Sequence, residues 1–296
     1  MIEKFRVASH LRVPHNYRQV SSLNWGYYSI IIINKTLTRR AKMSFSLQES
    51  EYTKIRDLFV NYPTLLTQDF ENRIKRSICV LHFAYLWGAC KEAQAILSKY
   101  PTTDIFSLIM RLYTKKRKFH QANFLLLHCF ENALRSTLAV KIADLYNKTC
   151  DDWFLQPINS NTSSAFAKLL KIVQRRCKGL EESKKTTWRI FDCFYLIDLQ
   201  EILEQHWSEF ASVFKNEKIY KDQTLPSYGT KEHLITKISQ IRTARNDVFH
   251  NKPTKIKFQK DLEILLLRLG YNLEEAINIG EVSTAITLQY NYKESR

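Results

Sequence analysis

Glycine and proline are scarce in this chain, with six of each among 296 residues. Both residues interrupt regular backbone, so their scarcity excludes a fold made of many short elements joined by tight turns. Leu and Lys, which favour helical backbone, are abundant instead. The composition therefore predicts an all-α fold with long uninterrupted helices.

The chain also lacks paired cysteines. Its six Cys contain no CxxC pair and no accompanying His cluster, which argues against the usual zinc-binding spacings. No secretory signal precedes them, so we expect free thiols in a reducing cytoplasm. The longest apolar run near the start, residues 27–33, is far shorter than a membrane span, and we expect no membrane partner.

Acidic residues are few relative to basic ones. The chain has 45 Lys and Arg against 29 Asp and Glu, a net charge of +16. An excess of this size favours an anionic partner, and nucleic acid is the first candidate. The alternative is a protein from an AT-rich genome, in which Lys codons are favoured.

The first 42 residues have the strongest imbalance of charge, with eight Lys and Arg and a single acid, Glu3. They show no helical periodicity. Three interpretations compete: a basic arm for nucleic acid, an organellar targeting peptide, or an over-long gene start with Met43 as the true first residue. We favour the third, so residues 1–42 are not expected to belong to the fold.

Apolar residues recur at helical spacing through most of the remaining chain. Thr230 is expected to cap a helix that Pro253 closes, and a basic run at 115–118 is expected to form a solvated corner. We expect loops at 156–164 and 216–228 and no strand after residue 50. The other expected helices are a first one ending at Tyr62–Pro63, and those over 68–88, 91–100, 103–115, 121–146, 165–177, 184–214 and 258–279.

The candidate catalytic residues lie near the end of the chain, in the string Arg245-Asn246-Asp247-Val248-Phe249-His250. An Arg can hold a phosphate with two parallel hydrogen bonds, and a His exchanges protons near neutral pH. This pair can cleave RNA without a metal ion or cofactor, and Asn246 can orient the Arg or the phosphate. The sequence contains no Gly-rich phosphate loop, Ser nucleophile elbow or HExxH motif.

The Arg-Asn-x-x-x-His string resembles the ribonuclease signature of the HEPN superfamily. An earlier segment, Glu131-Asn132-Ala133-Leu134-Arg135, is similar to a pattern on an early helix of such domains, and Trp153-Phe154 matches the aromatic residues that follow it. The amphipathic segment 199–210 and a final helix complete the order. The resemblance covers about residues 120–280, with an apparent insertion near 156–187.

This resemblance implies a HEPN-type helical bundle, in which the RNA 2′-OH attacks its own phosphate. It assigns Arg245, His250 and Asn246 to catalysis, with Glu131 and Arg135 as possible supporting residues. Such domains dimerise so that two motifs line one cleft, and they recur in abortive-infection proteins and toxin–antitoxin toxins. We therefore expect a homodimer that acts on RNA in phage defence or growth arrest, with an antitoxin or trigger protein as a possible partner.

The expected organisation is a lead segment at 1–42, a helical region at 43–115, the HEPN-like domain at 116–282 and a tail at 283–296.

Two alternatives to a nuclease stay open: a catalytically silent module that binds RNA or a protein, and a helical scaffold with an accidental motif. In the second, Arg245 simply pairs with an acid and His250 is a surface residue at a helix end. His120 and His128 are expected to be structural.

Overall fold

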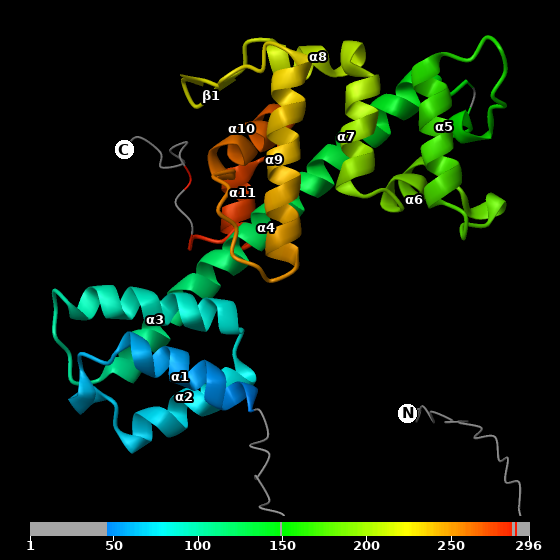
Figure 1. Cartoon of the computed structure of the whole chain (residues 1–296). Helices are drawn as coiled ribbons and strands as arrows, with labels where there is room; N and C mark the ends of the chain where they lie inside the picture. The colour runs from blue at the N-terminus through cyan, green and yellow to red at the C-terminus, as the bar shows by residue number, and fades with distance from the viewer. Residues whose placement is uncertain (1–45, 149, 286–287, 289–296) are drawn as a thin grey trace, which may run out of the picture. The chain divides into compact units, whose positions relative to one another are not determined.

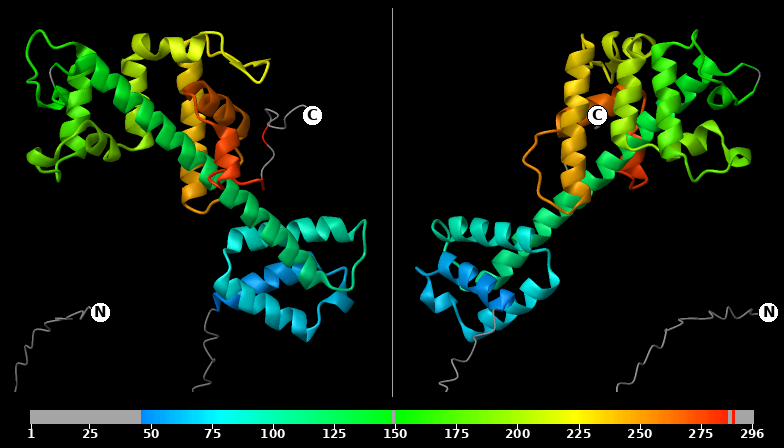
Figure 2. Two further views of the ribbon diagram at one scale, coloured as in Figure 1. Left: turned by 180° about the vertical axis from the view of Figure 1, so that it is seen from behind. Right: turned by 45° about the vertical axis from the view of Figure 1, so that its right-hand side comes forward.

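The computed structural model describes residues 46–148, 150–285 and 288, and the lead segment predicted at 1–42 lies outside them. The described residues are predominantly helical, with only one two-stranded sheet, so the predicted all-α fold class is confirmed. Figures 1 and 2 show the arrangement of the helices.

The first three helices are α1 (Leu47–Leu58), α2 (Gln68–Val80) and α3 (Phe83–Leu97). Thr67 caps α2 by accepting a hydrogen bond from a backbone N–H of the first turn. α1 ends before Tyr62–Pro63, the pair predicted to end it. The apolar sides of these helices form one core, whose larger members include Tyr52, Ile55, Phe59, Phe70, Ile74 and Leu86.

A helix break that the sequence did not predict separates α2 from α3. The expected helix over 68–88 ends at Val80, and Leu81 has extended backbone. The segment predicted as a separate helix at 91–100 belongs mostly to α3. The break contains neither Gly nor Pro, and apolar residues continue across it, so helical periodicity gave no sign of it.

One helix of 42 residues, α4 (Ile105–Tyr146), replaces the two predicted at 103–115 and 121–146. The prediction of a solvated corner at 115–118 is wrong, because these four basic residues lie in the middle of α4. Lys and Arg are good helix formers, so a polar run need not end a helix. The boundary predicted between 115 and 116 falls inside this helix.

The rest of the chain surrounds the second half of α4. Its elements are α5 (Ser164–Arg176), α6 (Thr187–Asp192), α7 (Leu196–Gln205), α8 (Trp207–Lys215), β1 (Ile219–Tyr220), β2 (Gln223–Thr224), α9 (Lys231–Phe249), α10 (Gln259–Leu269) and α11 (Leu273–Asn278). Helices α6, α7, α9 and α10 all pack on α4. A second core lies between them and includes Phe130, Leu134, Trp153, Phe191, Phe210 and Leu265.

Two predicted helices in this part are divided, and one short sheet was missed. The expected helix at 184–214 is α6, α7 and α8. The one at 258–279 is α10 and α11, because Gly270 ends α10 in the left-handed conformation with φ 87°. β1 and β2 form a hairpin whose turn residues, Lys221 and Asp222, also have positive φ.

Candidate active site

The α9 helix carries the Arg-Asn-x-x-x-His string at its C-terminal end. Thr230 caps its start, as predicted, by accepting a hydrogen bond from the His233 N–H at 3.2 Å. Five residues on one side of α9 are buried: Leu234, Ile238, Ile241, Ala244 and Val248. Their spacing of three or four residues fixes which face of α9 meets the core.

The end of α9 is set by local backbone geometry and comes before Pro253. His250 is the C-terminal cap residue, and Asn251 follows in the left-handed conformation with φ 57°. The Lys252 N–H donates to the Asp247 carbonyl at 2.7 Å, which satisfies a carbonyl of the last turn. His250 therefore lies directly after the last turn of α9, three residues before the Pro253 that was expected to close the helix.

Arg245 is held by a carboxylate on α4. Its Nε donates to Oε2 of Glu131 at 3.0 Å, and the guanidinium lies over the Phe249 ring, 4.0 Å from the ring centroid. The Phe249 ring in turn stacks on Phe124 of α4. The Glu131 side chain is only 8% exposed, so this ion pair is largely desolvated and well defined in direction.

Arg135 occupies the other oxygen of the same carboxylate. Its Nη2 donates to Oε1 of Glu131 at 2.9 Å. Arg135 also donates to the backbone carbonyls of Phe191 and Phe194, which fixes its guanidinium against the end of α6. Glu131 thus lies between two guanidiniums, that of Arg135, which is hydrogen-bonded to backbone carbonyls, and that of Arg245 on α9.

The structure therefore brings together three of the five predicted site residues: Arg245, Glu131 and Arg135. The other two, Asn246 and His250, are exposed, and neither side chain makes a hydrogen bond or ion pair among the residues that the structure describes. In an ideal helix five positions span about 500°, so Arg245 and His250 point roughly 140° apart. A single copy of α9 does not aim both side chains at one point.

A second polar group, which the sequence did not single out as a site, lies beside the end of α9. Arg117 of α4 donates to the Asn251 side chain at 3.3 Å. The buried His120 ring is hydrogen-bonded through Nδ1 to the Tyr85 hydroxyl. Burial, together with the positive charge of Arg117, lowers the pKa of His120, which favours the neutral ring. The structural role expected for His120 fits this environment.

Within the described ranges, no three His, Cys, Asp or Glu side chains are arranged as a metal site. None of the described helices has both the length and the apolar character needed to span a membrane. Comparison with models of protein families, with curated proteins and with solved structures found no match.

Proposed function

We propose that this protein is a metal-independent endoribonuclease of HEPN type that acts as a homodimer. The observation that carries the proposal is the fixed orientation of Arg245 by the buried Glu131 carboxylate. His250 is exposed at the end of the same helix. A phosphate-binding cation and a proton-exchanging group are thus presented by one rigid element.

Arg245 retains the donors that phosphate recognition needs. The hydrogen bond to Glu131 uses its Nε, and neither Nη1 nor Nη2 donates a hydrogen bond within the described part of the chain. Two parallel N–H groups match the geometry of two phosphate oxygens. Asn246, which is exposed on the next position of α9, would add a hydrogen bond to the phosphate or to the neighbouring ribose.

In the proposed reaction the RNA 2′-oxygen attacks the adjacent phosphorus, and the bond from phosphorus to the 5′-oxygen breaks. One His250 accepts the proton of the 2′-OH, and a protonated His250 gives a proton to the leaving 5′-oxygen. The products are a 2′,3′-cyclic phosphate and a 5′-OH. Arg245 stabilises the charge that builds on the phosphate oxygens.

The roughly 140° between the directions of Arg245 and His250 supports a dimer. Two copies related by a two-fold axis would place both α9 ends at one cleft, so that two His250 side chains can act as base and acid. Defence against phage, or growth arrest controlled by an antitoxin, would be the setting for such an activity.

A second candidate is a catalytically silent module that binds RNA or a protein. It is favoured by the contacts of Arg245 with Glu131 and with the Phe249 ring, because the same contacts are expected of an Arg that only stabilises the fold. The two candidates differ in whether RNA is cut.

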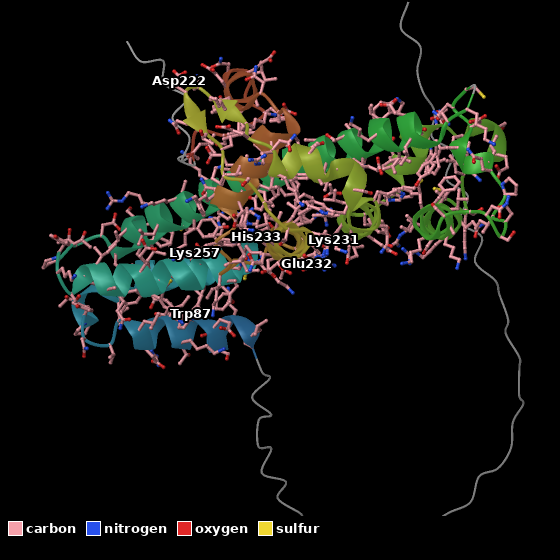
Figure 3. All side chains as sticks on the ribbon, turned by 90° about the horizontal axis from the view of Figure 1, so that it is seen from above. Trp87, Asp222, Lys231, Glu232, His233 and Lys257 are labelled. Carbon is pink, nitrogen blue, oxygen red and sulfur yellow. The ribbon has the colours of Figure 1, made fainter. Side chains whose placement is uncertain are left out.

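The test is cleavage of total RNA by the purified protein in the presence of EDTA. His250→Ala and Arg245→Lys should each lower the rate by roughly two to four orders of magnitude, because a proton-transfer group or a bidentate phosphate contact is lost. His233→Ala is the matched control, since this His is also exposed on α9 but lies near its start (Figure 3). Cleavage that persists in both variants would exclude the proposed mechanism, and folded wild-type protein without cleavage would favour the silent module.

A further inference from the structure

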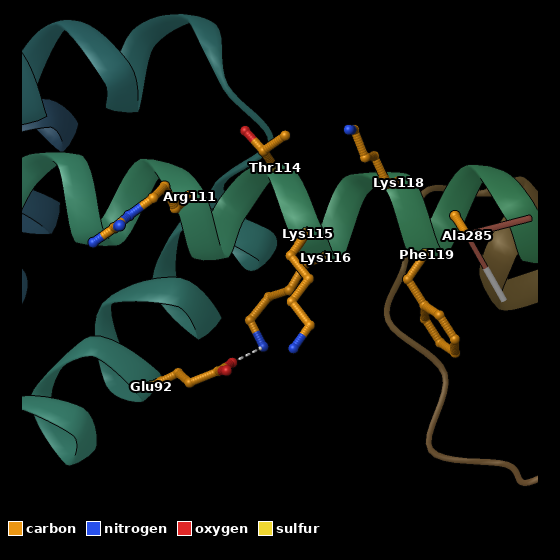
Figure 4. Close-up of a pocket in the computed structure, with 8 residues that line it drawn as sticks. All are labelled: Glu92, Arg111, Thr114, Lys115, Lys116, Lys118, Phe119 and Ala285. Atoms are coloured by element: carbon orange, nitrogen blue, oxygen red, sulfur yellow. Dashed lines mark ion pairs between the residues drawn. The ribbon is translucent and has the colours of Figure 1, made fainter. Parts of the chain in front are cut away.

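Three neighbouring cavities share one exposed aromatic ring, that of Phe119 on α4. The ring is 50% exposed. It lines cavities of about 470, 230 and 400 Å³, which follow the basic stretch of α4 and the segment between α9 and α10. Figure 4 shows Phe119 beside Lys115 and Lys116 on the wall of the largest of these three cavities. We call these three cavities, which share Phe119 in their lining, the α4 groove.

The lining of the α4 groove is strongly basic. Glu92 is its single acidic residue, and it pairs with Lys116 at 2.6 Å. The other cations that line the groove make no ion pair with any described residue: Arg111, Lys115, Lys118, Lys255, Lys257 and Lys260. Unpaired cations around an exposed aromatic ring are the combination that single-stranded nucleic acid requires, because the cations follow the backbone and the ring stacks on a base.

Asn123 adds a group that can read a base. It lies one helical turn after Phe119, is only 4% exposed, and lines two of the three cavities. Its Oδ1 has no hydrogen-bond partner among the described residues. A buried acceptor left unpaired is costly, so a ligand that supplies a hydrogen-bond donor to this oxygen would be favoured. The edge of a nucleobase can present such a donor.

The α4 groove adjoins the end of α9. Val248, two positions before His250, lines the cavity of about 230 Å³ together with Asn123 and His120. Pro253 and Thr254, just beyond His250, line the same cavity. A strand lying in the groove would therefore pass close to the residues proposed to cut it.

We propose that the α4 groove binds single-stranded RNA, with one unstacked base on the Phe119 ring and the edge of that base hydrogen-bonded to Asn123. Bases inside a duplex are stacked on one another and cannot reach the ring, so duplex RNA is a poor ligand. The role of the groove in cleavage rests on the proposed function, whereas RNA binding does not depend on it.

The test measures binding of a fluorescently labelled single-stranded RNA of about 12 nucleotides by fluorescence anisotropy. The full chain carries His250→Ala in this assay, so that the RNA is not cleaved. Phe119→Ala should weaken binding by about tenfold or more, and Phe119→Trp should restore it, because any aromatic face can stack. Trp188→Ala is the matched control, since Trp188 is a similarly exposed aromatic residue on α6 that lines none of the three cavities. Asn123→Asp should weaken binding and change the preference among homopolymers of A, C and U.

Because Phe119 is half exposed, its replacement should leave the thermal unfolding midpoint unchanged, and the Trp variant covers the case in which Ala unfolds. Equal binding of wild type and Phe119→Ala, or equal binding of single-stranded and duplex RNA, would overturn the proposal and leave only a cationic surface. Binding that depends on Phe119 in a protein that does not cut RNA would support the groove and reject the nuclease. RNA cleavage by a protein whose RNA binding does not depend on Phe119 would support the nuclease and reject the groove.

Discussion

Replacing Glu131 by Gln tests the arrangement on which the candidate site depends. The substitution keeps the size of the side chain but removes the charge that lies between Arg245 and Arg135. At an effective dielectric constant of about 20, each contact near 3.0 Å has a gross Coulomb energy of about 5 kcal/mol, much of which offsets desolvation. The amide also turns a donor toward one of the two guanidiniums, where only an acceptor fits.

Removing one partner of a buried ion pair commonly costs about 3–5 kcal/mol. Arg245 and Arg135 remain 24% and 18% exposed, so water can compensate part of their charge. We therefore expect Glu131→Gln to lower the free energy of unfolding by about 2–4 kcal/mol, measured by urea denaturation followed by circular dichroism. The folded variant should also cleave RNA about 10–100 times more slowly, because Arg245 loses its orientation.

A double-mutant cycle with Arg245→Gln isolates the interaction between the two side chains. Contacting charged residues should show a coupling energy of about 1 kcal/mol or more. The surface pair Asp69 and Arg73 is the control, since it is also charged but Asp69 is 73% exposed, and Asp69→Asn should change stability by less than about 0.5 kcal/mol. A loss below about 0.5 kcal/mol for Glu131→Gln, with no coupling to Arg245, would refute the positioning of Arg245 by Glu131.

Sedimentation of the active protein should show a homodimer, because one α9 helix does not aim Arg245 and His250 at a single phosphate; a fully active monomer would contradict the two-copy site. Stability should fall as the pH drops below about 6.5, since burial lowers the pKa of His206 and of His120, and the unfolded chain then binds more protons than the folded one. The contribution of each ring to this slope has an upper limit of about 1.4 kcal/mol per pH unit. His206→Gln should flatten it, as measured by urea denaturation between pH 7 and pH 5, and an unchanged slope would show that His206 does not titrate with unfolding.

The start of α9 and its buried face could be predicted from sequence because their signals are local. Thr230 is a good N-cap residue, and the apolar stripe continues to Val248. The i,i+4 pair of Glu131 and Arg135 was visible for the same reason. The contact between Glu131 and Arg245 joins residues 114 positions apart, and only the tertiary fold creates it.

Helix boundaries failed where the local signal was weak or misleading. The breaks after Val80 and Gln205 occur without Gly or Pro, because packing of both neighbouring helices on the core decides where the chain turns. The basic run at 115–118 appeared to be an interruption, although its residues favour helix. The α4 groove could not be predicted from this run: its four cations were visible, but the exposure of Phe119 and the unpaired amide oxygen of Asn123 depend on the surrounding elements.

The continuity of α4 affects how this protein can be divided or recombined. Ile105, Leu108 and Ile109 belong to the first core, and the buried apolar residues of α4 from Ala122 to Ile142 belong to the second. Between Ile109 and His120 the helix has no buried residue, so only its own backbone hydrogen bonds and partly exposed side chains support this stretch. A chimera joined at residues 115–116 would have to keep α4 in register across the junction. Insertion of one residue would rotate one core relative to the other by about 100° around the helix axis, whereas insertion of seven would nearly restore the phase.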